Sequence, residues 1–337
     1  MEKVAILGTG SWATALALVL TDNHYDVMLY GIDEAQVNDI NHNHRNSQFF
    51  KDIELNLGIK ATLSLEDTLQ DASYILLTIP TSQIRSTLEK VKPLLTTKVT
   101  IINAAKGFDL TTRKRISETI REVLSVEQRY EVVSLLGPSH AEEVIKRMLT
   151  TVCAVSLDLE VAHRVQKLFS NEYFRVYRQD DEIGAEYGVA LKNVIAIAAG
   201  AIYGLGYGDN TRAALVTRGL TEMVRYGLKK GGKFETYLGL TGIGDLVVTC
   251  SSIHSRNFQA GYQIGKENSS IRFMQENKLT VEGIRTCQVI YEEIQDDPSI
   301  EMPITEAIYQ VLYRLEKPNQ VIKQLMSRDL KKEGHII

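Results

Sequence analysis

The chain has 337 residues, of which 44% are hydrophobic and 24% are charged, and its formal net charge is −4. This composition is typical of a globular protein, and the length favours two domains over one. The slightly negative charge argues against a nucleic-acid-binding surface, because such a surface needs a concentrated basic face.

The first residues carry the most specific motif. An apolar run at residues 4–7 predicts a buried strand over residues 3–7, which ends on Gly8-x-Gly10-x-x-Ala13 and is followed at once by a helical pattern. Strand, glycine turn and helix in this order are the fingerprint of dinucleotide binding. Gly8 permits the tight turn, Gly10 lets a pyrophosphate approach the backbone, and Ala13 is small enough for helix and strand to pack. A glycine turn without a ligand is the less favoured alternative.

Strand-like and helix-like segments alternate as far as about residue 178. This alternation predicts an α/β, doubly wound, Rossmann-like domain with a mainly parallel sheet, which we place at residues 1–180. Ser64-x-x-Asp67 and Ser139-x-x-Glu142 resemble capping boxes and predict two helix starts. The strands are expected at residues 3–7, 26–30, 74–79, 99–104, 132–136, 150–155 and 173–177.

The strand signal ends at about residue 180, and the rest of the sequence predicts an all-α domain over residues 181–337. Its most apolar stretch, residues 194–207, is shorter than a membrane span and contains glycines, so we interpret it as part of a buried helix. With no targeting segment recognised, a cytoplasmic protein without a membrane span is expected. Helices are expected at residues 181–203, 211–230, 256–266, 284–295 and 302–315.

Polar residues follow the ends of two predicted strands, where ligands bind in open α/β sheets. Lys106 follows the strand 99–104, and an ammonium there can bind a phosphate or carboxylate, although a solvated loop lysine is an equal alternative. Gly137 follows the strand 132–136 and lets a ligand approach the backbone, and Ser139 is a candidate helix N-cap. His140 lies just inside the predicted helix start, which favours a structural role over acid–base chemistry.

The helical half contributes further candidates. Lys192 lies in the middle of an apolar helix, where an ammonium is costly unless it is paired or its pKa falls. We favour a general acid and base for a carbonyl/alcohol couple over a lysine that reaches a domain edge. Asp245 can orient that ammonium, with a helix N-cap as the competing role. A phosphate monoester could be bound by three consecutive residues: Ser255 as N-cap, Arg256 through its guanidinium and Asn257 through its amide. The alternative is a surface arginine beside a capped helix.

Metal and disulfide chemistry are not expected. Cys153, Cys250 and Cys287 lie far apart and form no CxxC pair, so they indicate reduced thiols. His42-x-His44 lies in a polar stretch without a third nearby ligand, so we interpret it as solvated surface rather than a metal site.

Seven segments, taken together in chain order, carry a resemblance to a known family: GTGSWATALA (8–17), AKG (105–107), GPSHAE (137–142), ALKN (190–193), NTRAALVTRGL (210–220), GIGDLVVTCSSIHSRN (242–257) and VEG (281–283). With these segments in this order, the chain resembles the bacterial type of NAD(P)-dependent glycerol-3-phosphate dehydrogenase. The matching segments span nearly the whole length of the chain.

The resemblance implies roles for individual residues. Lys192 matches the family's proton donor and acceptor, and Asp245 is expected to assist it as a catalytic residue. Substrate contacts are implied for Lys106, Gly137, Ser139, Asp245, Ser255, Arg256 and Asn257. Cofactor contacts are implied for Gly8, Gly10, Ser11, Trp12, Lys106, Ala141, Arg256 and Glu282.

The chain departs from the family in three places. Ala13 stands where many members have a third glycine, which the packing argument tolerates. Ile32 replaces the basic residue that often binds a 2′-phosphate, and Asp33 would repel that phosphate, so NAD is favoured over NADP. Residues 49–56 lack a proline that is usual in the family, so this stretch is expected to shape the adenosine side of the site differently.

The expected reaction is therefore the interconversion of dihydroxyacetone phosphate and sn-glycerol 3-phosphate by hydride transfer with NAD or NADP. The family also implies a supply of glycerol phosphate for phospholipid synthesis and a homodimer. Two alternatives stay open. One is a related dehydrogenase for a small 2-keto or hydroxy acid, which would not demand a substrate phosphate. The other is a catalytically silent dinucleotide sensor, which would need no buried lysine.

Overall fold

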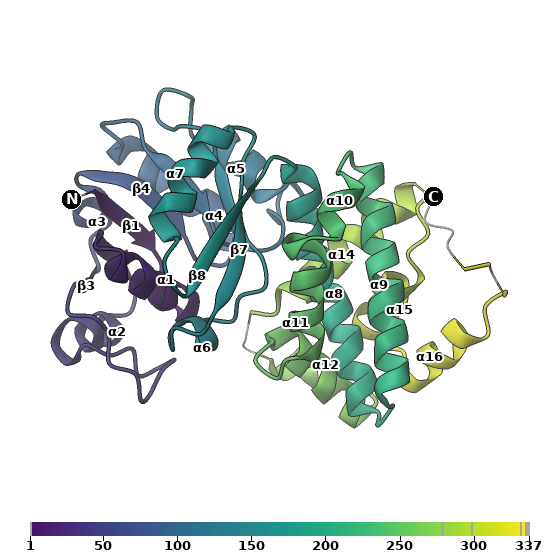
Figure 1. Cartoon of the computed structure of the whole chain (residues 1–337). Helices are drawn as coiled ribbons and strands as arrows, with labels where there is room; N and C mark the ends of the chain where they lie inside the picture. The colour runs from purple at the N-terminus through teal and green to yellow at the C-terminus, as the bar shows by residue number, and fades with distance from the viewer. Residues whose placement is uncertain (1, 278–279, 298, 331, 334–337) are drawn as a thin grey trace. The chain divides into compact units, whose positions relative to one another are not determined.

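The computed structural model describes residues 2–277, 280–297, 299–330 and 332–333. The chain forms two compact units, Met1–Glu182 and Ile183–Ile337. The first unit is α/β, and the described residues of the second form helices and connecting turns (Figure 1). The predicted fold class is therefore confirmed. The assignment of cofactor binding to residues 1–180 and substrate binding to residues 181–337 stays a prediction.

The first unit is built on one sheet of eight strands. The strands are β1 (Lys3–Leu7), β2 (Asp26–Tyr30), β3 (Ile59–Thr62), β4 (Ala72–Leu77), β5 (Thr100–Asn103), β6 (Val133–Leu136), β7 (Thr150–Val155) and β8 (Phe174–Gln179). Their spatial order is β3-β2-β1-β4-β5-β6-β7-β8. All neighbours pair in parallel except β6 and β7, which run antiparallel with Leu135 opposite Ala154. The expectation of a mainly parallel sheet holds, and the antiparallel pair is the exception.

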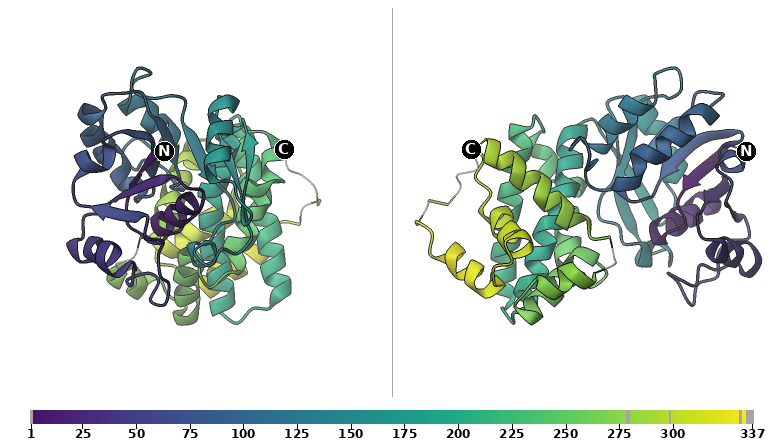
Figure 2. Two further views of the ribbon diagram at one scale, coloured as in Figure 1. Left: turned by 60° about the vertical axis from the view of Figure 1, so that its left-hand side comes forward. Right: turned by 180° about the vertical axis from the view of Figure 1, so that it is seen from behind.

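Helices cover both faces of this sheet (Figures 1 and 2). They are α1 (Ser11–Asp22), α2 (Glu34–Asn38), η1 (Asp39–Asn43), α3 (Leu65–Leu69), α4 (Thr81–Val91), η2 (Lys92–Leu94), α5 (Ile116–Val123), α6 (Ala141–Val144) and α7 (Leu159–Phe169). On one face α1, α6 and α7 share a buried cluster with Val4 and Ile6. On the other face α3, α4 and α5 share a cluster with Ala5 and Leu7. Because successive strand residues point to opposite faces, β1 is apolar along its whole length.

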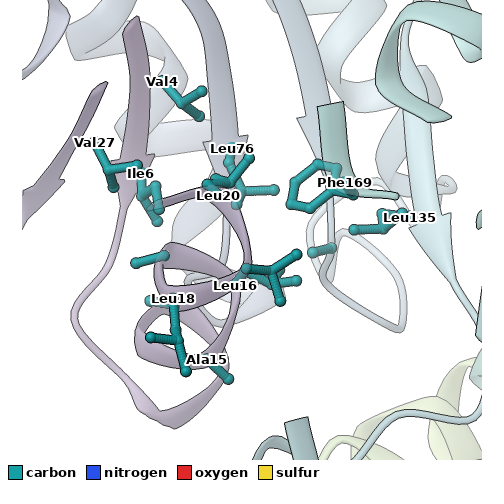
Figure 3. Close-up of a cluster of buried hydrophobic side chains, with 14 of the residues drawn as sticks. Val4, Ile6, Ala15, Leu16, Leu18, Leu20, Val27, Leu76, Leu135 and Phe169 are labelled. Atoms are coloured by element: carbon teal, nitrogen blue, oxygen red, sulfur yellow. The ribbon is translucent and has the colours of Figure 1, made fainter. Parts of the chain in front are cut away.

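The core beneath α1 fixes the start of that helix relative to β1. Figure 3 shows Val4 and Ile6 on β1 near Leu16 and Leu20 on α1. These four side chains and Ala13 are fully buried. This packing fixes the position of α1 against β1. The turn between them is therefore anchored at both ends.

The sequence did not predict β3. This strand has only four residues, and just two of them, Ile59 and Ala61, are buried. It pairs with β2 alone and forms the edge of the sheet. Such a short alternating segment contains too little apolar sequence to distinguish a strand from a loop.

The second unit contains α8 (Glu182–Gly204, whose first residue belongs to the first unit), α9 (Asp209–Lys229), α10 (Phe234–Tyr237), η3 (Leu240–Gly244), α11 (Asp245–Ser251), α12 (Arg256–Glu267), α13 (Ile271–Glu276), α14 (Glu282–Asp296), α15 (Pro303–Tyr313) and α16 (Pro318–Met326). The five predicted helices correspond to α8, α9, α12, α14 and α15. The short elements α10, α11, α13 and α16 were not predicted.

The long helix α8 is buried among the other helices. With 23 residues the helix is long and apolar enough to cross a membrane, but 94% of its most apolar stretch is buried inside the protein. A β-carbon placed on Gly200 would lie 2.0 Å from the Phe258 carbonyl oxygen, and one on Gly261 would lie 1.9 Å from the Ile197 carbonyl oxygen. Helices α8 and α12 therefore cross backbone to backbone, which explains the small residues that the sequence places in α8.

Candidate active site

The turn between β1 and α1 has the geometry that its glycines predict. Gly8 has a φ of +126°, in the left-handed region that favours glycine, and its N–H donates to the Tyr30 carbonyl at 2.9 Å. Gly10 is the N-cap of α1, and a β-carbon there would meet no atom within 4 Å. Ser11 and Trp12, both half-buried, form the first helical positions.

This turn fits the pyrophosphate of a dinucleotide. Within the described chain no side chain caps the N-terminus of α1, and its first turn contains no acidic residue. The N–H groups at this end and the helix dipole are therefore available to an anion. The open space beside Gly10 lets that anion approach the backbone. Gly8, Gly10, Ser11 and Trp12 together meet the requirements of the predicted cofactor site.

Three other predicted site residues meet at one backbone carbonyl. Lys106 Nζ and Ser139 Oγ each donate to the Gly137 carbonyl oxygen at 3.0 Å. Gly137 follows β6 with a φ of +143°, and a β-carbon there would approach Val152 Cα at 3.1 Å. Asn103, at the end of β5, shapes the turn that leads to Lys106, because its Oδ1 accepts the N–H of residue 105 at 3.0 Å. The carboxyl ends of β5 and β6 thus bring these side chains together.

The predicted N-cap role of Ser139 is wrong. His140 occupies the N-cap position of α6, and the Ser139 hydroxyl lies against the Gly137 carbonyl instead of the helix N–H groups. Helix α6 has only four residues, with Glu142 in its first turn and Ala141 buried at its start. The loop at residues 137–140 therefore presents side chains and turn backbone, with little contribution from a helix dipole.

Lys192 and Asp245 form an ion pair in the interior of the second unit. Lys192 Nζ lies 2.5 Å from Asp245 Oδ1 and 2.7 Å from Thr249 Oγ1. Lys192 is 4% exposed, Asp245 1% and Thr249 4%. The lysine therefore does not reach a surface, and the carboxylate balances its buried charge. The N-cap of α11 is Gly244, so the competing N-cap role for Asp245 is wrong.

Thr249 is a site residue to which the sequence analysis gave no role. Its hydroxyl donates to the Asp245 carbonyl oxygen at 2.6 Å, one turn earlier on α11, and accepts from Lys192. The signal in the sequence was the spacing of four residues, which places both side chains on one face of a helix. The neighbouring Cys250 does not compete as an acid or base at neutral pH, because burial raises the pKa of its thiol to about 12.

A chain of amides begins at Asn193, the residue that follows Lys192 in the sequence. Asn257 Nδ2 donates to Asn193 Oδ1 at 3.0 Å, and the Gly283 backbone N–H donates to Asn257 Oδ1 at 2.9 Å. Because the Gly283 backbone N–H can only donate, the oxygen of the Asn257 amide must face it, and the Asn257 NH2 group then faces Asn193. Asn193 must accept that bond, so its oxygen faces Asn257 and its NH2 group points away from Asn257. A β-carbon on Gly283 would lie 2.5 Å from the Asn193 carbonyl oxygen and 2.7 Å from Asn257 Oδ1. Glycine is therefore required at the start of α14.

The start of α12 holds the remaining predicted residues. Ser255 is its N-cap, and its Oγ accepts the N–H of Phe258 at 3.2 Å, as predicted. Arg256 is exposed at the first helical position, while Asn257 is buried. Glu282 is the first residue of α14, next to Gly283. A capped helix start with an exposed guanidinium and no acidic first turn is suited to a phosphate.

The described residues contain no group of three histidine, cysteine, aspartate or glutamate side chains that could hold a metal ion. His42 Nδ1 lies 3.1 Å from the Asn38 carbonyl oxygen. Cys153, Cys250 and Cys287 are buried free thiols.

A doubly wound sheet with a glycine turn after its first strand, and a helical unit with a buried lysine–carboxylate pair, together define a dinucleotide-dependent oxidoreductase. Comparisons with known proteins agree. Residues 3–162 match the family described as NAD-dependent glycerol-3-phosphate dehydrogenase N-terminus, and residues 181–323 match the corresponding C-terminus family. The chain therefore belongs to the NAD-dependent glycerol-3-phosphate dehydrogenase family, as its motifs indicated.

Individual relatives cover nearly the whole chain. The glycerol-3-phosphate dehydrogenase [NAD(P)+] of Exiguobacterium is 46% identical over 99% of this chain and 97% of its own length. The protein of the same name from Enterococcus faecalis is 47% identical over 99% of this chain and 98% of its own length. The crystal structure of glycerol-3-phosphate dehydrogenase from Coxiella burnetii has a TM-score of 0.90 at 33% identity, covering 97% of this chain and 99% of that one.

Proposed function

We propose that this chain interconverts dihydroxyacetone phosphate and sn-glycerol 3-phosphate with NAD(P)H as the hydride donor. The observation that carries this proposal is the buried Lys192–Asp245 pair in a chain whose first strand ends on a dinucleotide-binding turn. Relatives of nearly full length that are named glycerol-3-phosphate dehydrogenase [NAD(P)+] support the substrate.

The proposed chemistry needs one hydride and one proton at C2 of the substrate. The nicotinamide, when bound, supplies or accepts the hydride. Lys192 gives its proton to the C2 oxygen as the ketone is reduced, and takes it back when the alcohol is oxidised. Asp245 balances the ammonium charge, and Thr249 holds the direction of Nζ. This arrangement places the proton in a fixed position before the substrate arrives.

The substrate's phosphate gives the binding energy that positions C2. Arg256 and the capped start of α12 are proposed to bind this phosphate, with Asn257 and Ser255 as further contacts. In the first unit, Lys106, Gly137 and Ser139 are proposed substrate contacts, and Ala141 is a proposed cofactor contact. In the second unit, Glu282 is a further proposed cofactor contact. Binding a remote group in this way assists the reacting carbon, because it removes freedom that the reaction would otherwise have to restrict.

We propose NAD as the preferred cofactor. Ile32 follows β2 with 88% of its surface exposed, and it offers no charge to a 2′-phosphate. Asp33 is exposed and caps α2, accepting the N–H of residue 35 at 3.0 Å, so its carboxylate is fixed close to the end of β2. The adenosine ribose lies at this end of the second strand in Rossmann-like folds, and a carboxylate there favours a 2′-hydroxyl over a 2′-phosphate.

Three broader assignments are also proposed. A cytoplasmic location agrees with the burial of α8 and with three free thiols. A supply of glycerol phosphate for phospholipid synthesis follows from the product. A homodimer is proposed from the family resemblance alone. Light scattering from the purified protein measures that oligomeric state.

The deciding experiment follows NADH and NADPH oxidation in parallel with dihydroxyacetone phosphate, unphosphorylated dihydroxyacetone and pyruvate. We expect turnover with the phosphorylated ketone, faster with NADH than with NADPH. Turnover with pyruvate and not with dihydroxyacetone phosphate would replace this substrate with a 2-keto acid. NADH binding without turnover of any of the three would instead indicate a sensor.

A further inference from the structure

The turn between β1 and α1 is held from one side by the connection between β2 and β3. Asn46, which is fully buried, donates from Nδ2 to the Thr9 carbonyl oxygen at 2.9 Å and to Thr14 Oγ1 at 2.7 Å. Gln36 Nε2 donates to the same Thr9 oxygen at 2.9 Å and to Asn46 Oδ1 at 3.0 Å. Two amides from one connection therefore converge on a single carbonyl of the glycine turn.

The orientation of both amides is determined by their partners. The Thr9 carbonyl oxygen can only accept, so the nitrogen of each amide must face it. The Thr9 hydroxyl donates to Gln36 Oε1 at 2.5 Å, and the Thr14 hydroxyl, which accepts from Asn46, donates to the Gly10 carbonyl oxygen at 3.0 Å. Each amide hydrogen thus has a partner, and the network has one consistent arrangement.

This network determines where the next N–H groups point. In a planar trans peptide the C=O and N–H point in opposite directions. Because the Thr9 carbonyl faces Gln36 and Asn46, the N–H of Gly10 points away from them. The Gly10 carbonyl accepts from Thr14 Oγ1 and from the Thr14 N–H, both at 3.0 Å, which directs the next N–H, on Ser11, out of the helix start.

A purely structural role does not explain the network well. The β2–β3 connection already has apolar anchors in the core, because Val37 and Phe50 are 6% exposed and Ile40 is fully buried. Burying amides instead of apolar groups adds a desolvation cost. Both amides also donate to the Thr9 carbonyl of the cofactor turn, and within the part of the chain that the structure describes neither donates to the connection's own backbone.

We propose that Asn46 and Gln36 are positioning residues for the cofactor: they hold the Thr9 carbonyl so that the N–H groups of Gly10 and Ser11 face the dinucleotide pyrophosphate. The inference rests on the dinucleotide binding in the proposed function. Wild-type protein that binds no NADH would refute that function itself, whereas the variants below test the network alone.

The test measures dissociation constants of purified variants for NADH, ADP-ribose and adenosine. Gln36→Ala removes a half-exposed amide, and Asn46→Ala removes the buried one. Gln48→Ala is the matched control, an exposed amide in the same connection. We expect NADH and ADP-ribose, which both contain the pyrophosphate, to bind about 5- to 10-fold more weakly to each variant, because the Thr9 carbonyl loses one of its two amide donors. Adenosine binding and the control should stay within about 2-fold of wild type.

A further variant keeps the test decisive if Asn46→Ala does not fold. Gln36→Glu preserves the shape but places an oxygen against the Thr9 carbonyl, so it should weaken NADH more than Gln36→Ala does, while circular dichroism stays native. The proposal is wrong if the folded Gln36 variants bind NADH within about 2-fold of wild type. It is also wrong if adenosine weakens as much as ADP-ribose, because the network would then shape the adenosine side and not the turn.

Discussion

Lys192 Nζ and Asp245 Oδ1 lie 2.5 Å apart, and both side chains are buried in the helical unit. One partner comes from the middle of α8 and the other from the start of α11, so the pair exists only when the helices are packed. Thr249 adds a second bond to the same ammonium. A buried charge held in this way is suited to proton transfer, because neither its position nor its partner depends on solvent.

Replacing Lys192 with alanine should lower turnover by about 10²–10⁴-fold, which is the usual contribution of general acid–base catalysis. NADH should still bind, because the glycine turn lies in the other unit. Steady-state kinetics and NADH titration separate these two effects. Lys229→Ala, which removes an exposed lysine on α9, is the control. Near-native turnover by Lys192→Ala would remove the lysine from the mechanism.

Replacing Arg256 with alanine should mainly raise the KM for dihydroxyacetone phosphate, because the guanidinium is proposed to bind the phosphate. A loss of about 10- to 100-fold corresponds to one charge-assisted bidentate contact. Arg272→Ala is the matched control, since Arg272 is also exposed and pairs with Glu276 on α13. An unchanged KM, together with unchanged inhibition by inorganic phosphate, would contradict the assignment.

Replacing Gly283 with alanine should impair the substrate site without weakening NADH binding to a similar extent. The new β-carbon would lie within 3 Å of the Asn193 carbonyl and of Asn257 Oδ1, so the amide chain must shift. We expect kcat/KM for dihydroxyacetone phosphate to fall by about 10-fold or more, as for a displaced binding group. Gly208→Ala, at a position with open space around it, should leave kinetics unchanged. Wild-type kinetics for Gly283→Ala would mean that the amide orientation does not matter.

The stability of the second unit should depend on pH through Glu222. Its carboxylate accepts the N–H groups of Ile304 and Thr305 at the start of α15, and burial raises its pKa from 4.5 to about 7. At a pH between 4.5 and about 7, Glu222 is therefore protonated in the folded state and ionised in the unfolded state. The resulting stabilisation is complete below pH 4.5 and is lost as the pH rises through about 7.

Denaturant unfolding of wild type and Glu222→Gln across this pH range measures the effect. The free energy of unfolding of wild type, relative to that of the variant, should fall as the pH rises. Two curves that stay parallel over the whole range would show that Glu222 has the same pKa in both states.

The cofactor turn could be predicted from sequence because its determinants are local. The motif consists of four apolar residues, two glycines and a helix start, which follow one another directly in the sequence. Each of these constrains the backbone by itself. The antiparallel pairing of β6 and β7 could not be predicted in this way, because it depends on how the connection at residues 137–149, which contains α6, turns the chain. The wrong N-cap at Ser139 has the same origin: the left-handed Gly137 redirects the chain two residues earlier.

The supporting polar residues were the hardest to recognise. Asn46 lies in a polar stretch with His42 and His44. The composition of this stretch indicates solvated surface, yet Asn46 is fully buried. Asn193 and Thr249 stand in motifs that were noted for other residues. Asn193 bonds to a partner 64 positions away in sequence and Thr249 to one 57 positions away, and only the packed structure reveals such pairs.

The central claim is that Lys192 supplies the proton for reduction at C2. A crystal structure with NADH and glycerol 3-phosphate bound tests it most directly. We predict Lys192 Nζ within about 3 Å of the C2 oxygen, with C2 facing the nicotinamide ring. A structure in which protein separates the ammonium from that oxygen would contradict the mechanism.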